Sequence, residues 1–276
     1  MESPEEMLSP RAATIAPSEL PTFSPAVRTA LFDYLLRLGD DRLILGHRLS
    51  EWCGHGPILE EDLAIGNVSL DLIGHAQAFL ALAGRVEGKE RDEDRLTFFR
   101  GEREFRNIKL SELPRGDFAF TIARQFLFDS YAALLMEKLQ SCRFPELAGL
   151  AAKTLKEDTY HLRHSAQWVL RLGDGTLESH AKVQAAFNDL WAYSGEAFVA
   201  DEVELLLAKE LGIPDPSSLK AVWVERVSAL LKEATLQVPA DCFMHTGGRK
   251  GLHTEYLGKL LAEMQIVPRS YPDARW

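Results

Sequence analysis

Apolar residues recur at helical spacing along most of the chain. The pattern runs from Ala26 to about Leu260. Alternating stretches bounded by hairpin signals such as Asn-Gly are absent over the same span, so strands are not expected. The pattern therefore predicts an all-α protein.

Helix-breaking residues divide this pattern into long segments. Gly54, Gly56 and Pro57 end a first long helix, and the charged run at 88–95 follows a second. A third helix begins after an Asp117 cap and runs to about residue 140, and a fourth covers about 147–172. Each spans about 24 residues, or roughly 36 Å, which is typical of a four-helix bundle.

The last third of the chain predicts shorter helices. Thr176, after a Gly-Asp-Gly turn, is a suitable cap for a fifth helix that ends near Tyr193. Further helices are expected over roughly 197–211, 217–234 and 252–264. The sequence thus predicts a bundle with additional C-terminal helices.

Composition narrows the class of protein. The 276 residues are 46% hydrophobic and 26% charged, which is ordinary for a soluble globular protein. The net charge of −10, without a basic block, argues against a surface dedicated to nucleic acid or anionic membranes. The cysteines Cys53, Cys142 and Cys242 lie far apart and outside any CxxC spacing, so we expect reduced thiols in the cytoplasm.

The N-terminal segment differs from the rest. Residues 1–24 are acidic and rich in Pro and Ser, and we expect a disordered tail ahead of one helical domain over 25–276. No apolar run reaches the roughly 18 residues needed to span a bilayer. The sequence therefore predicts a soluble, cytoplasmic protein.

Acidic residues interrupt the apolar faces of the long helices. In di-iron carboxylate bundles two helices give one Glu each, and two others give Glu-x-x-His, since side chains three apart share a face. Asp158 and His161 have this spacing on the fourth helix. If the helices turn back midway, Asp129 lies level with Asp158, and Asp71 on the second helix lies level with Asp41 on the first.

The ligand set nevertheless departs from a working di-iron site. Each acid is Asp, shorter than Glu by one bond of about 1.5 Å, and metal distances tolerate only about 0.2 Å of error. The position three after Asp71 is Gly74, and His75 follows it as a possible extra ligand. We therefore predict a degenerate site, with no bound metal and no catalytic residue.

Other interpretations stay open for these polar residues. Asn67, Asp71 and His75 form a line that suits a hydrogen-bonded network, and Asp41 suits a solvated or capping role. Basic side chains are candidates to neutralise the acids where metals would sit. The candidates are Arg48, Arg124, Lys153 and Lys156. A further hypothesis assigns anion binding to the Gly-rich basic segment 247–251.

Five long strings in the sequence are distinctive. These are LGDDRLILGHRLSEWCGHGPILEEDLAIGNVSLDLIGHAQ (38–77), GEREFRN (101–107), GDFAFTIARQFLFD (116–129), LKEDTYHLRHSAQWVLRLGDGTLESH (155–180) and GGRKGLHTEYLGKLLAEMQ (247–265). In this order they resemble the structural C subunit of bacterial phenylacetyl-CoA epoxidase, a ferritin-like family, and the likeness covers residues 28–276. Two departures point toward metal: His75 replaces the Gln of the family string LDLIGQA, and Asp158 stands where relatives carry an apolar residue.

The resemblance implies a role in a complex that epoxidises the ring of phenylacetyl-CoA with O2 and NADPH. It implies that this chain binds no cofactor and pairs, as a non-catalytic scaffold, with a homologous A subunit that holds the di-iron site. A reductase with flavin and iron-sulfur centres would supply electrons. Two alternatives remain: a self-sufficient di-iron oxygenase that uses the aspartates and histidines above, or a metal-handling ferritin-like protein.

Overall fold

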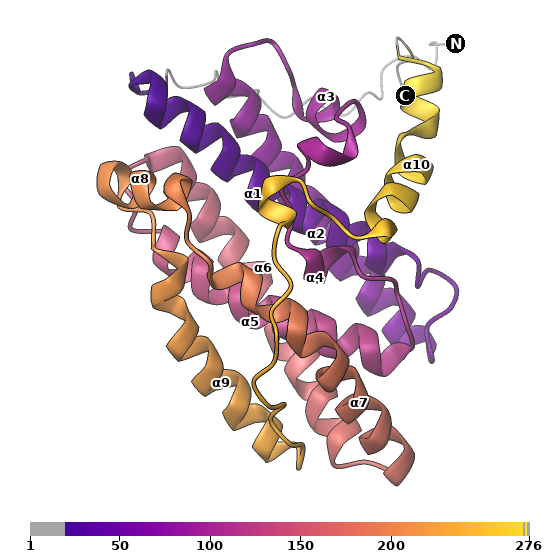
Figure 1. Ribbon diagram of the computed structural model, residues 1–276. Coiled ribbons are helices and arrows are strands. Elements are labelled where there is room, and N and C mark those ends of the chain that lie inside the picture. The colour runs from indigo at the N-terminus through magenta and orange to yellow at the C-terminus, as the bar shows by residue number, and fades with distance from the viewer. Residues whose placement is uncertain (1–19, 273, 275–276) are drawn as a thin grey trace, which may run out of the picture.

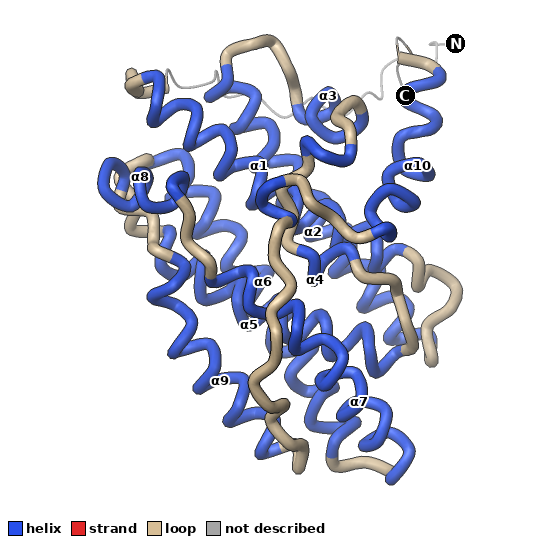
Figure 2. Tube along the Cα trace, viewed as in Figure 1, coloured by secondary structure: helices blue, strands red, loops and turns tan. Residues whose placement is uncertain are grey.

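The computed structural model describes residues 20–272 and 274, and in these residues it contains helices and no strand (Figure 2). The predicted tail at 1–24 falls mostly outside the described part of the chain. Two hairpins of long helices form the body (Figure 1). The first pairs α1 (Pro25–Ser50) with α2 (Leu59–Glu87), and the second pairs α5 (Phe118–Leu139) with α6 (Pro145–Gly173). The predicted all-α, ferritin-like bundle is confirmed.

Local chemistry explains where these helices begin and how closely they pack. Ser24 caps α1 by accepting from Val27 N at 3.3 Å, and the predicted Asp117 cap accepts from Phe120 N at 2.9 Å. Gly39 allows α1 to lie close against α2, because a Cβ there would be 2.8 Å from Leu80. The rotation of α1 about its axis is thereby fixed by its contacts with α2.

Shorter helices cover the second hairpin. The predicted Thr176 cap begins α7 (Leu177–Ser194), and α7 and α9 (Lys220–Glu233) both pack on α5. Trp223 anchors α9 by donating its indole N–H to the Leu127 carbonyl at 3.2 Å. The helix that lies between α7 and α9 in the sequence, α8 (Glu202–Leu211), packs against α1. The predicted helix over 197–211 is thus correct only from Glu202, since a 3-10 turn and an extended link come first.

The segment between the hairpins contains structure that the periodicity did not indicate. It forms α3 (Glu93–Phe98), a 3-10 turn η1 (Glu102–Glu104) and α4 (Lys109–Glu112). Arg100 holds it to α1 through a buried two-pronged ion pair with Asp40. Tertiary ion pairs, rather than an amphipathic pattern, therefore order this segment.

The chain returns to the first hairpin near its C-terminal end. After α9 a loop follows α7, where His245 N donates to Ala192 O at 2.8 Å. Residues 247–254, which we call the C-terminal clasp, then cross α1 and lead into α10 (Glu255–Ser270) (Figures 1 and 2). Inside the clasp, Arg249 forms a bidentate ion pair with buried Asp41, at 2.8 and 2.9 Å. The anion hypothesis for 247–251 is not supported, because Arg249 already has an internal carboxylate partner.

No helix in the described part of the chain is both long and apolar enough to cross a membrane. Cys53, Cys142 and Cys242 are free thiols.

Candidate functional site

A group of ionisable side chains lies between the four long helices. Arg42 comes from α1, Asp71 and His75 from α2, Asp129 from α5, and Asp158 and His161 from α6. We call these six residues the central polar cluster. All except Asp71 are buried.

Arg42 and Asp158 form the central ion pair. Arg42 Nη2 donates to Asp158 Oδ2 at 2.9 Å, and both side chains are only 2% exposed. The guanidinium also lies over the Phe79 ring, with Cζ 5.3 Å from the ring centroid. Such a pair tolerates burial only as long as both charges remain, because either one alone would be desolvated without compensation.

His75 is neutral at physiological pH. Burial, followed by repulsion from Arg42, lowers its pKa to about 4. Its Nε2 contacts Glu157 on α6, and its Nδ1 lies 3.8 Å from Asp158 Oδ1 and has no hydrogen-bond partner among the described residues. His75 thus links α2 to α6 through Glu157, and its Nδ1 faces Asp158 in the cluster.

His161 repeats this arrangement in the opposite direction. From α6 its Nε2 lies 3.0 Å from Asp71 Oδ2 on α2, while its buried Nδ1 makes no hydrogen bond within residues 20–272 and 274. The two imidazole centroids are 6.3 Å apart. The pair of histidines therefore joins α2 and α6 by two reciprocal carboxylate contacts.

Asp129 is the most perturbed acid of the cluster. Its Oδ1 accepts from Gln125 Nε2 and its Oδ2 from Ser165 Oγ, both at 2.7 Å. Burial raises the pKa of Asp129 to about 7 and outweighs the nearby His161 and both hydrogen bonds, which lower it. Asp129 therefore holds its proton to a much higher pH than an ordinary aspartic acid does.

The predicted carboxylate of the first helix is not at the site. Asp41 faces the C-terminal clasp, where Arg249 and the Ile108 N–H, at 2.8 Å, bind it. Consecutive helical residues are rotated by about 100°. The α1 face that reaches the cluster therefore carries Arg42, and placing Asp41 among the degenerate di-iron positions was wrong.

Gly74 was also wrongly placed. It is exposed, and a Cβ at this position would meet nothing within 4 Å in the part of the chain that the structure describes. A histidine at 74 would point into solvent, so its absence removes no ligand from the core. The imidazole that α2 provides is His75, which shares the α6 side of the helix with Asp71.

The basic residues proposed to neutralise the acids have other roles. Arg48 donates to the Glu112 and Tyr256 carbonyls, and Arg124 donates to those of Leu113 and Pro114. Lys153 and Lys156 are exposed. Arg42, which does neutralise Asp158, was missed, although it lies four residues after Leu38 and three before Leu45 on an apolar face.

The cluster does not fit a di-iron centre. The described residues contain no group of three or more His, Cys, Asp or Glu side chains placed to hold a metal ion. One helix of the required four presents a guanidinium, whose positive charge opposes a neighbouring cation. What the cluster does chemically is to hold α1, α2, α5 and α6 together.

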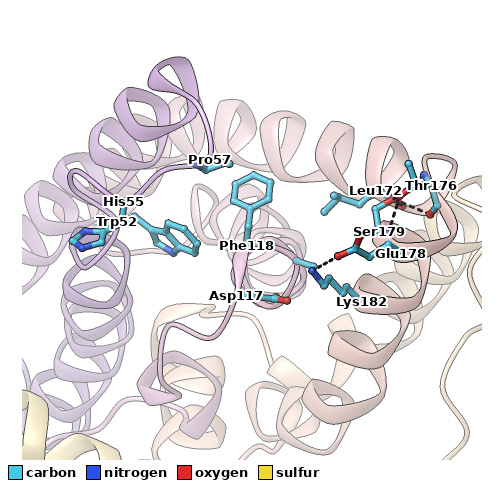
Figure 3. Close-up of a pocket in the computed structure, with 11 residues that line it drawn as sticks. Trp52, His55, Pro57, Asp117, Phe118, Leu172, Thr176, Glu178, Ser179 and Lys182 are labelled. Carbon is cyan, nitrogen blue, oxygen red and sulfur yellow. Dashed lines mark hydrogen bonds and ion pairs between the residues drawn. The ribbon is translucent and has the colours of Figure 1, made fainter.

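A separate cavity of about 490 Å³ opens at one end of the bundle (Figure 3). Trp52 and Phe118 form its apolar wall in an edge-to-face pair. Its polar groups already have local roles, since Asp117 caps α5 and Lys182 pairs with Glu178. The cavity lies about 17 Å along α5 from Asp129, so it is not part of the cluster.

Comparison with known proteins agrees with the sequence resemblance. A family model described as phenylacetic acid catabolic protein matches residues 19–276. The C subunit of 1,2-phenylacetyl-CoA epoxidase from Escherichia coli (strain K12) is 50% identical over 243 residues. That alignment covers 88% of this chain and 98% of the relative. The chain is a member of the phenylacetic acid catabolic protein family.

Proposed function

We propose that this chain is the structural, non-catalytic C subunit of a cytoplasmic phenylacetyl-CoA epoxidase. The observation that carries the proposal is the buried Arg42–Asp158 pair, which places a fixed positive charge inside the ligand sphere that a di-iron centre would need. The identity to the Escherichia coli C subunit, over nearly the whole of that relative, supports the same role.

The reaction of the complex then belongs to other subunits. Activation of O2 for ring epoxidation uses a metal centre with open coordination positions, and the cluster offers none. In this proposal the di-iron centre and the acyl-CoA site lie in the homologous A subunit, and flavin and iron-sulfur centres lie in the reductase. The present chain stabilises the A subunit by binding it.

An apolar stripe on α2 is the surface that we assign to this contact. Leu59, Leu63 and Leu70 are 72%, 59% and 68% exposed. Together with Gly66 and Gly74 they share one helix face, because they follow one another at intervals of three or four residues. A Cβ on either glycine would meet no atom of the described residues within 4 Å, so another helix can approach closely.

The size of the stripe suits the centre of a stable interface. It extends along about 22 Å of α2, and contiguous exposed apolar patches of this kind mark protein contacts. Stable complexes bury roughly 800 Å² on each partner, with charged residues excluded from the core of the patch. A helical, homologous subunit is the partner that matches a long, straight apolar helix face.

Co-expression with the A subunit from the same source tests the proposal. We expect the two chains to co-elute in gel filtration, and L63E/L70E to separate them while circular dichroism shows unchanged helix content. L177E is the matched control, because Leu177 is 93% exposed but lies at the start of α7. Independent elution of the wild-type chains, or normal pairing of L63E/L70E, would count against the proposal.

A further inference from the structure

Arg124 on α5 carries a buried positive charge that no carboxylate of the described residues binds. Its side chain is 0% exposed, and the groups that accept its hydrogen bonds are backbone carbonyls. The other buried arginines in the described part of the chain each pair with at least one acid. These pairs are Arg37 with Asp33, Asp201 and Glu204, Arg42 with Asp158, Arg48 with Glu51, and Arg100 with Asp40.

The unused donors of Arg124 lie together on one edge of its guanidinium. Nη1 donates to the carbonyls of Leu113 and Pro114, which follow α4. Nε and Nη2 are buried and make no hydrogen bond with any described residue. In other proteins this Nε–Nη2 edge grips a carboxylate through two parallel N–H bonds. The edge of Arg124 therefore offers two adjacent donors to an acceptor that the described residues do not supply.

The charge of Arg124 also lacks compensation. Among the described residues, the charges that act on it are those of Arg48, which repels it, and Glu51, which attracts it. The Glu51 carboxylate already binds Arg48 Nη1 at 2.6 Å, so one carboxylate serves two guanidinium groups. Burial, followed by repulsion from Arg48, lowers the pKa of Arg124 to about 9, and the group stays charged at neutral pH. A buried charge without a counter-ion is costly, and an anion beside it would offset that cost.

The surroundings of Arg124 restrict the size of such an anion. The side chain has no exposed surface, and it does not line the cavity beside Trp52 and Phe118. An organic acid, or an acidic side chain of another subunit, cannot reach a fully buried edge. A water molecule would accept both N–H bonds but would leave the charge uncompensated. A monatomic anion satisfies the two donors and the charge together.

We infer that the Nε–Nη2 edge of Arg124 binds a chloride ion in the interior of the protein. The ion neutralises the guanidinium at the point where α5 meets the Leu113–Pro114 link and the C-terminal part of α1. Chloride then has a structural role, because it relieves a buried charge in the folded state and has no such partner in the unfolded chain. This role does not depend on the pairing with another subunit.

Crystals of the full-length chain soaked in sodium bromide test the position of the ion. Bromide replaces chloride in anion sites and is located by its anomalous scattering. We expect a bromide peak within hydrogen-bond reach of both Arg124 Nε and Arg124 Nη2. A carboxylate or a water molecule bound to this edge in place of bromide would overturn the inference.

Thermal unfolding tests whether the ion matters in solution. At constant ionic strength, Tm should be higher in sodium chloride than in sodium gluconate, whose anion is too large for a buried site. The expected difference is about 3 to 6 °C at a chloride concentration of about ten times its Kd. R124M, which removes the charge and keeps an apolar side chain, should abolish the difference. R226M, at a 54% exposed position on α9, should retain it.

The wild-type measurements decide the question even if R124M does not fold. Equal Tm values for wild type in chloride and gluconate would overturn the inference, and a bromide peak found together with them would identify an adventitious ion only. A folded R124M that keeps the full chloride response would also overturn it, since the ion would then act elsewhere. None of these outcomes depends on the result of the co-expression experiment.

Discussion

Burial decides the protonation of Asp129, and hence the charge of the central polar cluster. Its carboxyl group is almost fully excluded from water, and two hydrogen-bond donors do not restore an ordinary pKa. The folded chain holds this proton up to a pKa of about 7, whereas an unfolded Asp releases it near 3.9. Asp129 therefore favours the folded state fully below about pH 4, and this contribution is lost as the pH rises through about 7.

The replacement D129N should remove this pH dependence. Between pH 5 and pH 8 the free energy of unfolding of wild type should fall by about 2 to 3 kcal/mol more than that of D129N, as measured by urea denaturation at each pH. An Asn amide can still accept from Gln125 and donate to Ser165, which keeps the local contacts. D189N, at an exposed position on α7, should behave like wild type. Equal pH profiles for wild type and D129N would contradict the assignment.

The residues of the cluster could be predicted only in part from the sequence. Asp158 and His161 follow from their spacing, and Asp129 from its isolation in an apolar helix; the structure brings all three together. The sequence predicts Asp41 because it is an acid level with Asp71, and nothing in the pattern indicates Arg42. Asp41 is not in the cluster because tertiary contacts, such as that of Gly39 with Leu80, set the rotation of α1, and one residue along a helix turns a side chain by about 100°.

Among the structural elements, the C-terminal clasp depends on glycines that lie directly against backbone. A Cβ on Gly248 would lie 2.2 Å from the Asn107 carbonyl oxygen. The Gly248 N–H donates to Glu196 at 2.7 Å, and the next residue, Arg249, neutralises Asp41. Any displacement of the clasp therefore takes the Gly248 N–H away from Glu196 and the guanidinium away from Asp41, and weakening the contacts of two buried carboxylates is costly.

The substitution G248A should destabilise the chain by roughly 2 to 4 kcal/mol, because backbone must move to admit the methyl group. Urea denaturation followed by circular dichroism measures the loss. G149A is the matched control: Gly149 lies in α6 with no described atom within 4 Å of its Cβ position, and alanine should stabilise the helix by about 0.5 to 1 kcal/mol. Similar effects of the two substitutions would show that the clasp does not pack as described.

Long amphipathic helices could be predicted from the sequence, whereas short helices could not. The four long helices and the caps at Asp117 and Thr176 follow from periodicity and capping chemistry, and the structure confirms them. The short helices between residues 93 and 112 were not predicted. They depend on the contact of Arg100 with Asp40, which lies 60 residues away in the chain, and no local pattern encodes such a pairing.

At the scale of the whole molecule, the bundle balances its buried charges with its own side chains. Asp40, Asp41 and Asp158 lie on or against α1, and each has an arginine as partner: Arg100, Arg249 and Arg42 respectively. These pairs connect α1 to α6, to the segment between the hairpins and to the clasp. The arginines of the chain thus neutralise these buried aspartates without a metal ion. A metal-dependent bundle, in contrast, gains part of its stability from a bound ion.

The thermal stability of the wild-type chain should therefore not depend on metal. A metal ion present at 100 times its dissociation constant would add about 2.7 kcal/mol to the folded state, or roughly 5 to 10 °C in Tm for a chain of this size. We expect Tm to agree within about 1 °C between EDTA and added Fe²⁺, since Arg42 already satisfies Asp158. A wild-type Tm that falls on chelation would show that an ion, and not Arg42, holds the four helices together.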